Sequence, residues 1–85
     1  MSTKNERVAL ELNESKSTLT VSYSPKTDRA LFDICDLNGR ILKTGELSKK
    51  GTTVKVGELY DDHYILMVLD GDKAISERFE IKRAS

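Results

Sequence analysis

Residues 64–69 are the most apolar run of the sequence and read Tyr-Ile-Leu-Met-Val-Leu. The run is too short for a typical helix and is followed by Asp70-Gly71-Asp72, so it has the length and the boundary of a buried strand. We therefore expect it to be the central strand of the core. Asp70-Gly71-Asp72 is expected to turn the chain, and residues 73–81 to close the sheet.

Shorter alternating runs precede this strand, each bounded by turn residues, and predict strands at 8–12, 18–23, 30–37, 40–47 and 52–56. No segment carries apolar residues at i, i+3, i+4 and i+7 over three turns, so we expect no helix. Seven short strands with turns spaced about 8–12 residues apart predict an all-β fold. The expected fold class is a small immunoglobulin-like, Greek-key sandwich of about seven antiparallel strands.

Asn38-Gly39 lies between two of these runs and predicts a hairpin with a type I′ turn, which requires positive φ at both central residues. In the strand before the turn, Phe32 and Ile34 are expected on one face. The opposite face of that strand is also apolar, which indicates a central strand or partial cover on the second side. In the strand after the turn, Leu42 and Thr44 are expected to point inward.

Leu59-x-Asp61-x-x-Tyr64 stands directly before the central strand. In Greek-key sandwiches a tyrosine at this position folds over the connection, and its hydroxyl bonds to backbone a few residues upstream. The alternative is an ordinary core tyrosine whose hydroxyl faces solvent. Both remain open from the sequence.

The chain has 85 residues, which is the size of a single domain. We expect the sandwich to occupy residues 8–83, with a disordered N-terminal tail at 1–7 and a short C-terminal tail at 84–85. The N-terminal residues are polar and predict no signal peptide. No apolar run approaches the ~20 residues of a membrane span, so no membrane insertion is expected.

The charge balance bears on possible partners. Lys+Arg and Asp+Glu number 14 each, and the longest basic runs are the pairs Lys49-Lys50 and Lys82-Arg83. A nucleic-acid binder needs a clustered excess of basic residues, so no nucleic-acid partner is expected.

No catalytic constellation can be assembled from the sequence. Cys35 is the only cysteine and lies within a predicted strand, where a thiol usually behaves as a small apolar group. His63 is the only histidine; with Asp61 and Asp62 it suggests at most a weak divalent-ion site, and a solvated loop histidine is the simpler interpretation. We expect no enzyme activity, no cofactor and no metal site.

Several strings together resemble a known family. They are Asp36-Leu37-Asn38-Gly39-Arg40, the Leu59 to Tyr64 connection, and a final strand ending in Ile81-Lys82-Arg83. In order and spacing they are similar to the C-terminal sorting domains (type A) of the Bacteroidetes type IX secretion system.

The resemblance implies a seven-stranded sandwich that outer-membrane export machinery reads as a sorting signal. It implies a protein partner, and a location at the cell surface or outside the cell as part of a larger protein. The implied motif positions are Asp36, Gly39, Arg40, Leu59, Tyr64, Ile81, Lys82 and Arg83. The alternative is a stand-alone structural or protein-interaction protein, intracellular or of phage type, that associates through a sheet edge.

Overall fold

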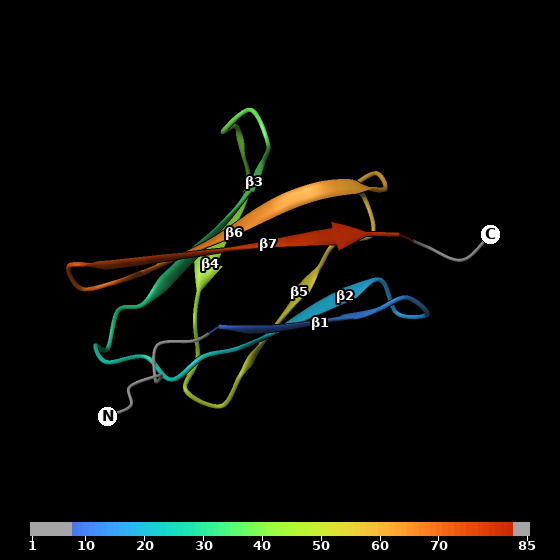
Figure 1. The fold of residues 1–85 in the computed structure, drawn as a ribbon. Coiled ribbons are helices and arrows are strands. Elements are labelled where there is room, and N and C mark those ends of the chain that lie inside the picture. The colour runs from blue at the N-terminus through green and yellow to red at the C-terminus, as the bar shows by residue number, and fades with distance from the viewer. Residues whose placement is uncertain (1–7, 83–85) are drawn as a thin grey trace, which may run out of the picture.

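The computed structural model describes residues 8–82 and contains seven strands (Figure 1). Their bounds are β1 Ala9–Asn13, β2 Thr18–Ser22, β3 Leu31–Asp36, β4 Ile41–Glu46, β5 Thr52–Lys55, β6 Asp62–Asp70 and β7 Lys73–Ile81. No helix occurs between residues 8 and 82. The predicted tails at 1–7 and 84–85, together with Arg83, lie outside the described residues.

The strands form two antiparallel sheets, one in the order β1-β2-β5 and the other in the order β4-β3-β6-β7. Figure 1 shows β1 and β2 crossing the molecule below β6 and β7, so the two sheets form two layers. Each predicted run became a strand, and the predicted all-β sandwich of seven antiparallel strands is confirmed.

Strand β6 is the centre of the larger sheet and pairs with β3 on one side and β7 on the other. Its alternate residues Tyr64, Leu66 and Val68 face the smaller sheet, and Leu66 and Val68 are fully buried. They pack against apolar side chains of the other layer, including Leu19 and Val56. The prediction that residues 64–69 form the central core strand is confirmed, because β6 has neighbours on both sides and across the layers.

A bulge in the pairing of β3 with β4, between Ile34 and Cys35, decides which side chains of β4 face the core. Lys43 lies opposite Ile34, but Ile41 lies opposite Cys35, so Leu42 is an extra residue on β4. The extra residue shifts the alternation of the strand by one.

The prediction that Leu42 and Thr44 point inward is therefore wrong, since both are exposed. The core side of β4 instead carries Gly45, which lies against the Phe32 ring. A Cβ at Gly45 would come within 2.8 Å of Phe32 Cε2. Glycine is needed here because the aromatic ring occupies the space of a side chain.

Asp70, at the end of β6, is buried with 2% of its surface exposed. Its carboxylate accepts four hydrogen bonds from the β2–β3 connection. The donors are Tyr23 Oη (2.7 Å), Lys26 N (2.7 Å), Thr27 N (3.0 Å) and Thr27 Oγ1 (2.7 Å). These donors, led by the Lys26 amide, lower the pKa of Asp70 from 3.8 to about 2. The carboxylate therefore holds the β2–β3 connection, which joins the smaller sheet to the larger one, against the end of β6.

Candidate recognition site

The turn between β3 and β4 is organised by the carboxylate of Asp36. Its Oδ1 accepts from the backbone N–H groups of Asn38 and Arg40, each at 2.9 Å. The backbone adds two further bonds: Gly39 N–H donates to the Asp36 carbonyl and Asp36 N–H to the Arg40 carbonyl, both at 3.0 Å. Four bonds across five residues hold the turn in one conformation.

This turn is not type I′. Gly39 has φ +88°, whereas Ser17 is the only non-glycine residue with positive φ between residues 8 and 82, so Asn38 lacks the second positive φ that type I′ requires. The pattern is a three-residue loop in which a type I turn is followed by a left-handed glycine. The predicted hairpin is present, but its turn type was wrong, because the Asp36 side chain stabilises the longer loop.

Three large apolar side chains around this turn are exposed to solvent: Leu37 at 50%, Ile41 at 59% and Leu42 at 37%. Arg40 is exposed between them. Figure 1 shows the turn standing clear of the strands of both sheets. We call Leu37, Arg40, Ile41 and Leu42 the hairpin tip. Its surface is apolar with one cationic group.

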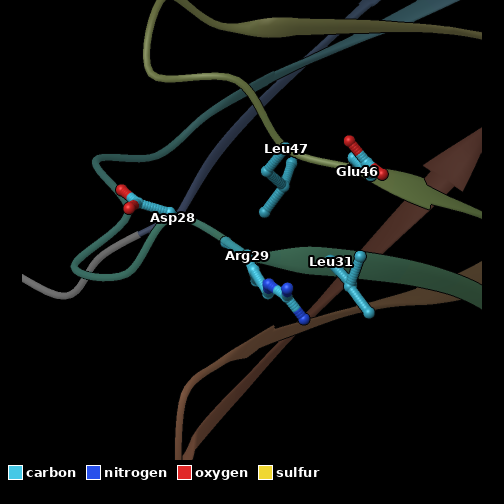
Figure 2. A pocket seen from close by; sticks show the side chains of 6 residues that line it. Asp28, Arg29, Leu31, Glu46 and Leu47 are labelled. Carbon is cyan, nitrogen blue, oxygen red and sulfur yellow. The ribbon is translucent and has the colours of Figure 1, made fainter.

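A hollow of about 440 Å³ lies at the other end of the same hairpin. Leu47 N–H donates to the Ala30 carbonyl at 2.9 Å and closes the base of the hairpin there. The lining residues are Asp28, Arg29, Ala30, Leu31, Glu46 and Leu47. Figure 2 shows Asp28 and Glu46 on opposite sides of Leu47, while the Arg29 side chain points away from Leu47. The hollow is therefore lined by two carboxylates and a guanidinium as well as by apolar side chains.

The connection before β6 has the geometry of a tyrosine corner. The Tyr64 hydroxyl donates to the Tyr60 carbonyl at 2.6 Å, four residues upstream, while the Tyr64 ring packs in the core near Phe79. The predicted corner is confirmed, and the alternative of a solvent-facing hydroxyl is excluded. Leu59 packs against the same core from the connection.

The motif positions at the end of β7 differ in their surroundings. Ile81 is 1% exposed and belongs to the core. Lys82 is exposed, and Arg83 lies outside the described residues. Of the predicted positions, Asp36, Gly39 and Arg40 share the β3–β4 turn. Leu59 and Tyr64 form the corner, so the eight positions do not gather at one site.

Reactive groups are few within residues 8–82. Cys35 is buried, and its burial, followed by the charges of Asp33 and Asp36, raises the pKa of the thiol. His63 Nε2 lies 4.0 Å from Glu80 Oε2 on the neighbouring strand. Across this part of the chain no three His, Cys, Asp or Glu side chains come close enough to hold a metal ion. Nor does it contain a helix able to cross a membrane.

Sequence reasoning missed the exposure of the hairpin tip and the hollow at its base. Leu37 was the available signal, because the central residues of hairpin turns are usually polar or glycine. The hollow had no such signal, since it combines the loop before β3 with the end of β4.

Comparison with known proteins adds no family to the class of protein that the fold defines. No protein-family model matches this sequence, and no curated protein matches it significantly. The chain is a small all-β protein of seven antiparallel strands in two packed sheets.

Proposed function

We propose that this domain is a non-catalytic recognition module that another protein binds, of the kind represented by the C-terminal sorting domains of type IX secretion. The observation that carries the proposal is the hairpin tip, a rigid turn that presents Leu37, Ile41 and Leu42 to solvent beside Arg40. Clustered exposed apolar side chains on a small protein mark interaction sites.

The rigidity of the turn favours recognition. A preorganised contact surface loses little conformational entropy on binding, so more of the contact energy remains as affinity. Asp36 gives the turn its rigidity, because its side chain accepts hydrogen bonds from two backbone N–H groups of the turn. The same residues, Asp36, Gly39 and Arg40, carry the most specific part of the family resemblance.

A catalytic role has less support. A hydrolase or transferase site needs a nucleophile and a base within hydrogen-bond reach, in a pocket that excludes water. The only cysteine is buried with a raised pKa, and the only histidine lies beside Glu80 on an exposed face. A binding role requires neither group.

The test is an export assay in a bacterium that has a type IX system. Residues 8–85 are fused behind a signal peptide and a folded reporter, and the reporter is measured in the periplasm, at the surface and in the medium. A sorting domain carries the reporter to the surface or the medium, and deletion of the export machinery traps it in the periplasm. The Lys82→Ala, Arg83→Ala double variant tests whether the basic end of the domain is also read.

A reporter that remains periplasmic behind an intact, folded domain would overturn the sorting role. The stand-alone interaction protein would then be the better account. That account keeps the hairpin tip as a binding surface and removes only the export machinery as its partner.

A further inference from the structure

Strand β7 is the longest open sheet edge in residues 8–82. The two sheets end there in four edge strands, β1, β5, β4 and β7. β1 and β5 have five and four residues, and β4 is interrupted by its bulge. β7 has nine residues, which pair with β6 in an unbroken register. Every second residue of β7 therefore directs its N–H and C=O groups away from β6, where a further strand can bond them.

One side chain of β7 restricts which strands can pair with this edge. Glu77 lies opposite the fully buried Leu66 of β6, so it shares the core-facing side of the sheet with Ile75 and Phe79. Glu77 is nevertheless exposed, while Ile75 and Phe79 are half-buried against the core. An inward-facing charge on an edge strand prevents indiscriminate pairing, because an apolar partner would desolvate it. A strand that pairs with β7 must therefore place a cation beside Glu77.

β7 itself carries a cation at the required position. Lys73 is exposed and lies four residues before Glu77, on the same face of the strand. When two copies of β7 pair antiparallel about a twofold axis at Ile75, Lys73 of each copy lies opposite Glu77 of the other. Ala74 then lies opposite Ser76, and the two Ile75 side chains meet at the axis. Opposite charges that face each other across two strands stabilise the pair.

The neighbouring charges match in the same register. Arg78 comes opposite Asp72, which ends the β6–β7 turn of the other copy, and both residues are exposed. Glu80 and Lys82 lie beyond the paired stretch, which runs from residue 72 to residue 78. Every charged residue of that stretch therefore faces an opposite charge.

Other positions of the axis are less favourable. An axis at Glu77, Arg78 or Glu80 would place like charges directly opposite each other, which destabilises a strand pair. An axis at Ser76 or Phe79 would leave Glu77 opposite an isoleucine. An axis nearer the turn than residue 75 would leave no residue of β7 opposite Glu77. The charge pattern of β7 thus fits a second copy of itself in one register.

We propose that two copies of the domain pair antiparallel through β7 about Ile75, so that their four-stranded sheets join into one sheet of eight strands. The contact is isologous and uses the only edge of β7 that β6 leaves open, so it closes at the dimer. The inference goes beyond the proposed function, because the hairpin tip adjoins β4, at the opposite edge of the sheet, and takes no part in the contact.

The test uses sedimentation velocity on the purified chain from about 10 µM to about 1 mM, the range suited to a small and weak interface. The wild type is expected to show a monomer–dimer equilibrium without larger species. Glu77→Lys places two cations opposite each other on each side of the axis, and Lys73→Glu does the same with carboxylates. Each variant is expected to have its dimerisation constant lowered about tenfold or more.

Mixing the two variants makes the facing charges opposite again. A 1:1 mixture of the Glu77→Lys and Lys73→Glu chains is expected to form a heterodimer, and the double variant with both substitutions is expected to form a homodimer. Glu80→Lys is the matched control, because it makes the same change of charge in the same strand but outside the paired stretch. It should dimerise like the wild type.

Cysteine cross-linking tests the register. Ala74 and Ser76 are exposed, and the proposed pairing brings Ala74 of one copy opposite Ser76 of the other, with Cα atoms about 4.5–5.5 Å apart, within the reach of a disulfide. Either residue lies diagonally from its own copy, at roughly 7–8 Å. A mixture of Ala74→Cys and Ser76→Cys chains is therefore expected to cross-link on oxidation, and each chain alone is not. Cys35 is buried and is not expected to compete.

Three results would overturn the proposal: a wild type that stays monomeric throughout this range, a mixture of the charge variants without a heterodimer, or loss of the dimer in Glu80→Lys. Circular dichroism and melting of each variant establish that it is folded. The proposed function fails separately, because Glu77→Lys leaves the hairpin tip unchanged. A Glu77→Lys domain that no longer dimerises but still exports the reporter supports both inferences as independent properties of opposite edges of one sheet.

Discussion

Replacing Tyr23 by phenylalanine removes one hydrogen bond from the buried Asp70 carboxylate and nothing from the core packing of the ring. The Tyr23 hydroxyl donates to Asp70 Oδ2 at 2.7 Å, and both side chains are buried. A hydrogen bond to a charged group contributes about 1.5–3 kcal/mol. Asp70 keeps its donors from Lys26 and Thr27, so the variant leaves no orphaned charge. We expect Tyr23→Phe to lower the free energy of unfolding by that amount at pH 7.

The assay is urea unfolding followed by circular dichroism, with Tyr60→Phe as the control because that side chain is 86% exposed. A loss of 1.5–3 kcal/mol corresponds to a fall in Tm of roughly 6–24 °C in a domain of this size. A loss below about 0.5 kcal/mol at pH 7, equal to the control, would refute the reasoning, since it is smaller than an ordinary buried hydrogen bond.

The pH dependence of this loss identifies Asp70 as the acceptor. The folded state lowers the pKa of Asp70 from 3.8 to about 2, so its contribution is fully present above the unfolded value. That contribution is lost as the pH falls from about 4 toward about 2, where the folded carboxylate takes up a proton. We expect the gap between wild type and Tyr23→Phe to be constant from pH 7 to about 4 and to narrow below it. A gap that stays the same at pH 2 would contradict the assignment.

Three further outcomes follow from the same structure. Tyr64→Phe should lower the free energy of unfolding by about 0.5–1.5 kcal/mol, because it removes the hydroxyl that donates to the Tyr60 carbonyl at 2.6 Å. Equal, negligible losses from Tyr64→Phe and Tyr60→Phe in urea unfolding would argue against the corner. Gly45→Ala should lower the free energy of unfolding by about 1–3 kcal/mol, because the added Cβ would overlap the Phe32 ring. An unchanged free energy of unfolding would show that the ring moves aside freely. Calcium or zinc at sub-millimolar concentration should leave Tm unchanged, since a ligand that binds only the native state raises it; a clear rise would reveal a site at Asp61, Asp62 and His63.

The sequence was sufficient for the strands because each one buries a face that the alternation already marks. Tyr64, Leu66 and Val68 alternate with residues of the outer face, and all three are buried. Turn chemistry separated the runs correctly, including Asn38-Gly39. The order of the strands in the two sheets could not be predicted from the sequence, because it depends on which strands pair with partners that are distant in the chain.

The errors in β4 have a local cause. A two-residue turn at Asn38-Gly39 would pair Ile34 with Lys43 and Phe32 with Gly45, so it would already put Leu42 and Thr44 on the outer face, and the two predictions conflicted. The Asp36 carboxylate stabilises a three-residue loop, which by itself would turn Leu42 and Thr44 inward, and the bulge at Leu42 restores the pairing of Ile34 with Lys43. A pattern of apolar residues shows neither a hydrogen bond from a turn to a side chain nor an extra residue in one strand of a pair.

The candidate site was only partly predictable. The resemblance pointed to Asp36, Gly39 and Arg40 as motif positions, but it did not indicate that neighbouring Leu37 and Ile41 are exposed. Asp70 looked like part of an ordinary turn, and its four donors come from the distant β2–β3 connection. The exposure of the tip depends on no distant segment among residues 8–82 covering it, and the role of Asp70 depends on a contact between segments that are far apart in the chain.

The most direct measurement of the central claim compares reporter export by three versions of the domain in a type IX strain. They are the intact domain, a tip variant with Leu37→Ser and Ile41→Ser, and the control Tyr60→Ser. All three should melt within a few degrees of one another, because the substituted side chains are exposed. The account predicts that the intact domain and Tyr60→Ser bring the reporter to the surface or the medium, while the tip variant leaves it in the periplasm. Export of the folded tip variant at the level of the intact domain would contradict the claim that the hairpin tip is what the partner recognises.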